Sequence, residues 1–222
     1  MRLAANLAID KQAINEVERM GLGRPTGSII PRSFEFALPL EPFPYDPDRA
    51  RRLLAEAGYP NGFNAGDFNP APPFYSMGEA IANYLGAIGI RTKMRTMERA
   101  AFMSAWGEKK LKGLLMVASG VSGNAATRIE TFVLGTGTYA YGGRADIDDL
   151  FRQQEVERDR NKREALLHQI QRLMHERVMQ APIFEPATLH GVGPRVKEPA
   201  VGLNSLLCFA APYEEMRLKG RE

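Results

Sequence analysis

The chain has 222 residues, 44% of them hydrophobic and 25% charged, and a formal net charge of +3. These values are ordinary for a globular domain and argue against a disordered chain or a strongly basic nucleic-acid-binding surface. A single cysteine, Cys208, excludes an internal disulfide and a cysteine metal cluster, and no apolar run approaches the ~20 residues of a membrane-spanning helix.

Residues 1–45 predict two short helices and an irregular connection. A helical pattern over 2–8 is followed by Asp10, which is suited to cap a second helix that runs to Gly21. The stretch that follows, to residue 45, is rich in proline and glycine, which favour turns. The first ten residues do not resemble a secretory signal, so for an exported protein we expect the signal to lie outside this sequence.

Residues 46–57 form the most clearly bounded helix that the sequence predicts. Asp46 is suited to accept hydrogen bonds from the first free N–H groups, and Pro47 fits the first helical position. Gly58 can adopt the left-handed conformation that closes a helix, and Pro60 prevents its continuation. The expected apolar face consists of Ala50, Leu53, Leu54 and Ala57.

The middle of the chain alternates predicted helices and strands. Residues 60–73 are expected to be turn-rich, because they combine prolines, glycines and asparagines. Helical spacing over 77–88 is followed by alternation over 90–97, which is typical of a half-exposed strand. A helix over 100–110 and a buried strand over 111–118 continue the rhythm, which predicts an α/β layer architecture.

The last part of the chain predicts loops and two helices. Residues 120–143 are rich in glycine and threonine and are expected to form a loop region. Helices are expected over 146–156 and 161–179, followed by a short extended piece over 182–186. No long periodic element is expected in the final stretch of the chain.

The stretch from Tyr45 to Phe63 has the pattern YDP-x-x-A-x-x-LL-x-EAGY-P-x-GF. This pattern resembles a segment of the extracellular solute-binding proteins of the dipeptide, oligopeptide and nickel receptor family, which deliver ligands to ABC importers. Other stretches resemble the same family in the same order. They are residues 2–14, 21–31, 86–90, 147–184 and 213–220. Each stretch alone is a weak signal, but the ordered series extends over nearly the whole chain.

The resemblance implies a fold and a division of the chain. The expected fold is α/β, a periplasmic-binding-protein-like lobe of type II with a mixed sheet flanked by helices, incomplete relative to the two-lobed family fold. Residues 1–192 would form the second, C-terminal ligand-binding lobe. Residues 193–222 would form the tail that in the family returns across the hinge to the first lobe.

The resemblance also implies a function. It indicates a periplasmic substrate-binding component of an ABC-type importer for a small solute, peptide-like or otherwise polar, and not an enzyme. The expected partners are the ABC permease of the inner membrane and the missing N-terminal lobe; no cofactor and no nucleic acid is expected. Because ligand bridges both lobes in the family, we expect this chain alone to bind ligand weakly.

The loop after the strand expected over 111–118 holds the main candidate ligand residues. In peptide-binding members this loop carries an aspartate that pairs with the ligand's amino group, whereas here no acidic residue occurs from 118 until Glu130. The candidates are Ser119, Ser122, Asn124 and Arg128. Such donors and one cation suit a carboxylate-bearing or polyhydroxylated ligand. Alternatively, the serines and the asparagine satisfy loop backbone and Arg128 pairs with Glu130 or a helix end.

Three aromatic residues are further candidates for one wall of the ligand site. They are Trp106, Tyr139 and Tyr141. The alternative is half-buried packing with a satisfied polar tip, which is the more frequent role of such residues.

The sequence is also compatible with two other functions. The first is a ligand-sensing module of the same fold in a regulator. The second is a small serine hydrolase, because residues 120–124 approach the pattern G-x-S-x-G around Ser122, although the last position is asparagine. His168 and His175 share a helical face without an evident third ligand, so no metal site is expected.

The C-terminal tail carries apolar residues that would pack on the absent lobe. They are Leu206, Leu207 and Phe209. Their exposure would favour a homodimer.

Overall fold

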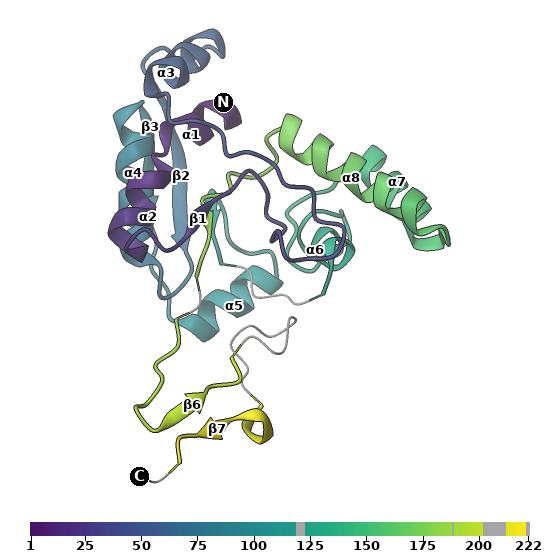
Figure 1. Cartoon of the computed structure of the whole chain (residues 1–222). Helices are drawn as coiled ribbons and strands as arrows, with labels where there is room; N and C mark the ends of the chain where they lie inside the picture. The colour runs from purple at the N-terminus through teal and green to yellow at the C-terminus, as the bar shows by residue number, and fades with distance from the viewer. Residues whose placement is uncertain (119–122, 188, 202–211, 221–222) are drawn as a thin grey trace. The chain divides into compact units, whose positions relative to one another are not determined.

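The computed structural model describes residues 1–118, 123–187, 189–201 and 212–220, which divide into a unit over Met1–Glu185 and a unit over Pro186–Glu222 (Figure 1). The first unit contains, in chain order, α1 (Arg2–Ala8), α2 (Lys11–Arg19), β1 (Arg24–Pro25), α3 (Pro47–Glu56), β2 (Phe63–Pro70), α4 (Tyr75–Ala87), β3 (Ile90–Met94), α5 (Arg99–Gly107), β4 (Leu114–Met116), α6 (Ala125–Phe132), α7 (Ala145–Val156), α8 (Arg160–Glu176) and β5 (Phe184–Glu185). The second unit contains β6 (Val196–Glu198), the 3-10 turn η1 (Tyr213–Glu215) and β7 (Arg217–Leu218).

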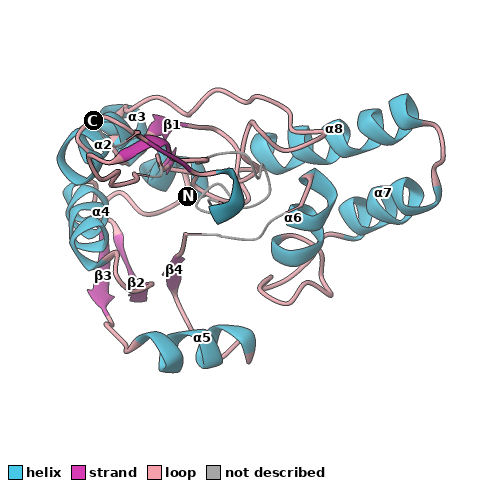
Figure 2. Ribbon diagram, turned by 60° about the horizontal axis from the view of Figure 1, so that its bottom comes forward, coloured by secondary structure: helices cyan, strands magenta, loops and turns pink. Residues whose placement is uncertain are grey.

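The central sheet has the strand order β3-β2-β4, and both pairs are parallel (Figure 2). From β2 the chain passes through α4 to β3 on one side, and then through α5 to β4 on the other side of β2. Two further sheets are antiparallel pairs, β1 with β5 and β6 with β7. Parallel and antiparallel pairings thus occur in separate small sheets.

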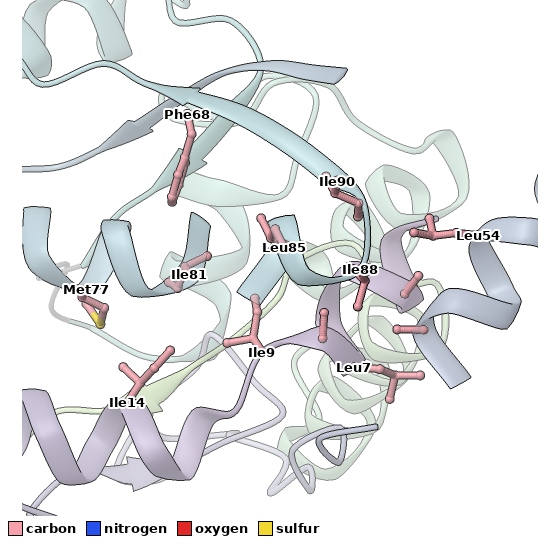
Figure 3. Packing of buried hydrophobic residues seen from close by; sticks show 13 residues of the cluster. Leu7, Ile9, Ile14, Leu54, Phe68, Met77, Ile81, Leu85, Ile88 and Ile90 are labelled. Carbon is pink, nitrogen blue, oxygen red and sulfur yellow. The ribbon is translucent and has the colours of Figure 1, made fainter. Parts of the chain in front are cut away.

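A hydrophobic core joins α1, α3 and α4 to the central sheet (Figure 3). Leu7 of α1, Leu54 of α3 and Leu85 of α4 are almost fully buried, together with Phe68 of β2 and Ile90 of β3. Burying each such side chain stabilises the fold by roughly 1.5–3 kcal/mol. A second core joins α6 to α7 and α8 through Ile129, Ile147, Leu167 and Ile170.

The capped helix expected over 46–57 is confirmed as α3. The Asp46 side chain accepts a hydrogen bond from the backbone N–H of Arg49 at 2.9 Å, Pro47 is the first helical residue, and Gly58 has φ +88°. Ala50 and Leu54 are buried. The expected apolar face is wrong at Ala57, which is exposed, because the helix ends one residue earlier and Ala57 lies in its cap.

The turn-rich stretch expected over 60–73 is wrong, because most of it is the central strand β2. Phe63 pairs with Ile90 of β3, and Phe68 pairs with both Met94 of β3 and Leu114 of β4. A strand with partners on both sides is stabilised by its neighbours more than by its own residue preferences. The asparagines and the glycine within β2 favour turns when they are considered alone, so the sequence does not predict this strand.

The loop region expected over 120–143 is also wrong in part, because it contains α6. Asn124 caps this helix. Ala125 and Ile129 of the helix, and Val133 directly after it, are buried in the second core. The cap and the four-residue spacing are local helix signals, but the surrounding glycines and threonines obscured them.

The helices expected over 2–8, 77–88, 100–110 and 146–156 are confirmed within two or three residues. The helix expected over 161–179 ends at Glu176. The tail residues Leu206, Leu207 and Phe209 lie outside the described residues. In the part of the chain that the structure describes, no helix combines the length and apolar character needed to cross a membrane.

Candidate functional site

The topology of the central sheet predicts where a ligand would bind. β3 and β4 lie on opposite sides of β2, so the connection from β2 to β3 and the connection from β3 to β4 run in opposite directions across the sheet. Open α/β sheets bind ligands outside the carboxyl ends of their strands at such a switch point. Here β2 ends at Pro70 and β4 at Met116, and Pro70 pairs with Met116. The candidate loop follows β4 directly.

An aromatic cluster lies at this edge of the sheet. The ring of Tyr139 stacks on the indole of Trp106 with centroids 4.1 Å apart, and Phe132 stacks on both at 6.0 Å from Trp106 and 5.7 Å from Tyr139. The cluster also contains Ala71 and Val117, which directly follow β2 and β4. The structure therefore brings together two of the three expected aromatic candidates and adds Phe132, a residue that the sequence analysis missed.

Trp106 is packed inside this cluster, with 4% of its surface exposed. Its indole Nε1–H finds no acceptor among the described residues. A buried tryptophan N–H normally has a hydrogen-bond partner, because an unpaired buried donor is costly. Trp106 is therefore a packed residue whose polar tip has no partner in the described parts of the chain, and its role in ligand binding stays a prediction.

Tyr141 lies apart from the stacked rings. Its side chain is 49% exposed, and its hydroxyl oxygen accepts a hydrogen bond from the backbone N–H of Leu111 at 3.2 Å. This contact holds the segment that leads into β4. A role of Tyr141 in ligand binding stays a prediction.

Asn124 has a structural role at the start of α6. Its side-chain oxygen accepts a hydrogen bond from the backbone N–H of Thr127 at 3.2 Å. This agrees with the alternative in which the loop asparagine satisfies backbone groups. Ser119 and Ser122, the other neutral candidates, lie outside the described residues.

Arg128, on α6, adjoins the aromatic cluster through Phe132. It is 3% exposed, and its guanidinium carbon lies 5.2 Å from the ring centroid of Phe34 and 5.7 Å from that of Phe132. Nε and Nη1 have no hydrogen-bond partner among the described residues. Burial lowers the pKa of Arg128 to about 10, so the side chain is still a cation at neutral pH.

The expected pairing of Arg128 with Glu130 does not occur in the part of the chain that the structure describes. The ion pairs found there do not include Arg128, and Glu130 is exposed while Arg128 is buried. Consecutive turns of a helix place side chains four apart on one face, so Arg128 faces Phe132 instead. This spacing was a usable signal for Phe132, whereas Phe34 is remote in sequence and gave none.

The two histidines of α8 have separate environments. His175 stacks on Phe43 with ring centroids 4.4 Å apart, and its Nδ1 lies 3.1 Å from the carbonyl oxygen of Gly27. His168 lies 3.7 Å from a carboxylate oxygen of Glu164. Among the described residues, no group of three His, Cys, Asp or Glu side chains is placed to hold a metal ion.

Residues 1–140 match the family described as bacterial extracellular solute-binding proteins, family 5 Middle. Heme-binding protein A of Haemophilus influenzae is 29% identical over 211 residues, which cover 89% of this chain and 38% of that protein. Glutathione-binding protein GsiB of Escherichia coli is 33% identical over 129 residues, which cover 55% of this chain and 25% of that protein. Both relatives are named as binding proteins.

The solved structure of the periplasmic binding protein DppA of Helicobacter pylori, in complex with the peptide STSA, matches with a TM-score of 0.77 at 22% identity. The match covers 89% of this chain and 40% of that chain. It confirms the expected fold class, an α/β lobe of the type II periplasmic-binding-protein kind. The chain spans less than half the length of each of these relatives.

Proposed function

We infer the function from one premise: the chain belongs to the bacterial extracellular solute-binding proteins of family 5. We propose that it is the C-terminal lobe portion of the substrate-binding component of an ABC-type importer. The solute is small and peptide-like or otherwise polar. The component acts in the periplasm and delivers its ligand to an ABC permease of the inner membrane.

In this proposal, residues 1–192 form one wall of a ligand cleft and residues 193–222 return to a first lobe that supplies the other wall. Ligand that bridges the two walls stabilises the closed form. The chain alone lacks half of the contacts, so its binding is weak. The apolar tail residues Leu206, Leu207 and Phe209, which would pack on the first lobe, would favour a homodimer of the chain alone.

The observation that supports this proposal most directly is the group of residues at the carboxyl edge of the sheet. Trp106 and Arg128 are both buried, and both carry N–H groups without acceptors among the described residues. Tyr139 and Phe132 supply apolar surface beside them. A concentrated apolar surface with a few unpaired polar groups is typical of small-molecule sites. Ser119, Ser122, Asn124 and Tyr141 belong to the proposed site on sequence grounds alone.

Nuclear magnetic resonance tests the proposal, because it detects weak binding. Trp106 is the single tryptophan of the chain, so its indole N–H gives one signal that needs no assignment. Titration with dipeptides, tripeptides, glutathione, neutral sugars and short carboxylic acids should shift this signal saturably for at least one class. The solute should be recovered unchanged.

Three results would each contradict a part of the proposal. Failure of every solute class to move the Trp106 signal would argue against a ligand site at this edge. Hydrolysis of a solute would argue for an enzyme. Tight binding in calorimetry would leave the ligand site standing but contradict the assignment of the chain to one lobe of two.

A further inference from the structure

We propose that the ligand carries a carboxylate and that this carboxylate binds Arg128, with the indole N–H of Trp106 as a second donor. The inference rests on the proposed function, because it names the chemical class of the solute that the same site takes.

The first argument is the uncompensated charge of Arg128. The side chain is almost fully buried and stays protonated at neutral pH, and Nε and Nη1 have no acceptor in the described parts of the chain. A buried cation is tolerated when a counter-charge and hydrogen bonds compensate its lost hydration. Arginine cannot lose its proton under ordinary conditions, so an acceptor has to come from elsewhere.

The neighbours of Arg128 supply only part of this compensation. Phe34 and Phe132 lie at cation–π distance from the guanidinium group. Aromatic rings attract the positive charge, but they offer no oxygen to the N–H groups. The contacts therefore hold the guanidinium in place and leave its donors available.

The carboxylates on the surrounding elements are engaged elsewhere or face solvent. Glu35, which follows Phe34, forms an ion pair with Arg160 at 2.6 Å. Asp148 of α7 accepts a hydrogen bond from the backbone N–H of Gly135 at 3.3 Å. Glu130 on α6 itself is exposed. None of these three groups is a partner of Arg128 in the part of the chain that the structure describes.

The second argument is the uniform polarity of the unpaired groups. Trp106 Nε1, Arg128 Nε and Arg128 Nη1 are all donors, and both side chains pack against Phe132. A set of donors with one positive charge selects an acceptor that carries negative charge. A ligand ammonium would be repelled, and a neutral hydroxyl would accept a hydrogen bond without neutralising the cation. Of the two ligand classes that suit the loop residues, the carboxylate-bearing class fits better than the polyhydroxylated class.

The test compares propionate with propionamide, which has nearly the same shape and no charge. Both are titrated into the nitrogen-15-labelled chain at constant ionic strength, and the Trp106 indole N–H and Arg128 Nε–H signals are followed. Propionate should shift both signals saturably, and propionamide should shift neither to a comparable extent. Equal responses to the two probes would overturn the proposal without any variant being needed.

Arg128→Gln should weaken the propionate response of Trp106 by about 10-fold or more, because a charge-assisted hydrogen bond is lost. Arg52→Gln, at an exposed arginine of α3, is the matched control and should respond as the wild type does. If Arg128→Gln does not fold, Arg128→Lys replaces it and should keep a weakened response to propionate over propionamide. A wild-type response in Arg128→Gln would overturn the proposal.

The two proposals fail in different ways. If sugars or peptides that lack a carboxylate shift the Trp106 signal, and do so equally in the wild type and in Arg128→Gln, the ligand site stands and the carboxylate assignment is wrong. If no solute shifts Trp106 and Arg128 Nε–H shows no response to propionate, both are wrong, and Arg128 has a structural role.

Discussion

The ring of Tyr139 stacks on the indole of Trp106, with centroids 4.1 Å apart and planes inclined by 27°. The two residues come from different parts of the chain, since Trp106 lies near the end of α5 and Tyr139 lies in the segment after α6. The stack therefore ties α5 to the segment that follows the candidate loop. It also covers the indole that carries an unpaired N–H group.

Tyr139→Ala should expose the indole of Trp106 to water. The expected result is a red shift of tryptophan fluorescence and a loss of about 2 kcal/mol in the free energy of unfolding, because stacking and buried area are both removed. Tyr141→Ala is the control: it changes a half-exposed ring and should leave the emission maximum in place. An unchanged spectrum for Tyr139→Ala would show that the stack does not form in solution.

Gly62 and Gly58 provide a matched pair for testing the turn between α3 and β2. Both have positive φ, +71° and +88° respectively. A Cβ atom at Gly62 would lie 2.0 Å from the carbonyl oxygen of Gly89, which accepts the N–H of Phe63 at 2.9 Å, whereas a Cβ at Gly58 meets open space.

Gly58→Ala should therefore lower the free energy of unfolding by about 1–2 kcal/mol, the cost of a left-handed alanine. Gly62→Ala adds a backbone clash and should cost about 3 kcal/mol or more, with loss of the pairing between β2 and β3. Urea denaturation of the two variants measures the difference. Equal effects would mean that the turn relaxes without disturbing the sheet.

The sequence predicted those elements whose signals are local. Asp46, Pro47 and Gly58 bound α3 within a few positions of one another, and each acts through its own backbone geometry. β2 depends on its pairing with β3 and β4, which are distant in sequence, whereas the local residue preferences of Phe63–Pro70 predict turns. Local preference is a weak guide to a strand with two partners.

In the candidate site, too, the sequence predicts local features and does not predict contacts between distant segments. Trp106, Tyr139 and Arg128 were identified by residue type in a region where the family binds ligand. That Trp106 and Tyr139 stack, and that Arg128 lies between Phe34 and Phe132, depends on the packing of three separate segments. The absence of acidic residues from 118 to 129 was visible in the sequence, but the burial of Arg128 was not.

Lys11 predicts a pH dependence of stability. It is 4% exposed, and burial lowers its pKa from 10.5 to about 8, against the smaller opposing effect of the Asp10 charge. Its Nζ donates hydrogen bonds to the carbonyl oxygens of Asn6 and Phe43. Between pH 8 and pH 10.5 the unfolded chain binds a proton at Lys11 that the folded chain has lost.

The free energy of unfolding should therefore rise with pH across that window, by up to about 3 kcal/mol from this group. Below pH 8 Lys11 is protonated in both the folded and the unfolded chain, so it adds nothing to the dependence of the free energy of unfolding on pH. Lys11→Met lacks the titrating group, so the difference between the wild type and this variant isolates the effect from other groups that titrate in alkali. If the free energy of unfolding changes with pH in the same way in the wild type and in Lys11→Met, Lys11 keeps an ordinary pKa in the folded chain.

We expect opposite effects on stability when Arg128 and Gln171 are each replaced by methionine. Gln171 is buried with its hydrogen bonds formed: Nε2 donates to the carbonyl oxygens of Phe36 at 2.8 Å and Leu167 at 3.1 Å, and Oε1 accepts the N–H of Leu38 at 2.8 Å. Arg128 is equally buried, but two of its nitrogens have no partner among the described residues.

Gln171→Met leaves two backbone groups without partners, the carbonyl of Phe36 and the N–H of Leu38, and should lower the free energy of unfolding by about 2–4 kcal/mol. Arg128→Met removes a buried charge that the ligand-free chain does not compensate, so it should leave stability unchanged or raise it by about 1 kcal/mol or more, while abolishing the propionate response. Groups kept for binding are often costly to the fold that carries them, because their partners arrive only with the ligand. Thermal and urea denaturation without ligand measure both variants. A destabilised Arg128→Met would mean that the chain itself pairs the guanidinium, and the case for a ligand carboxylate would fall with it.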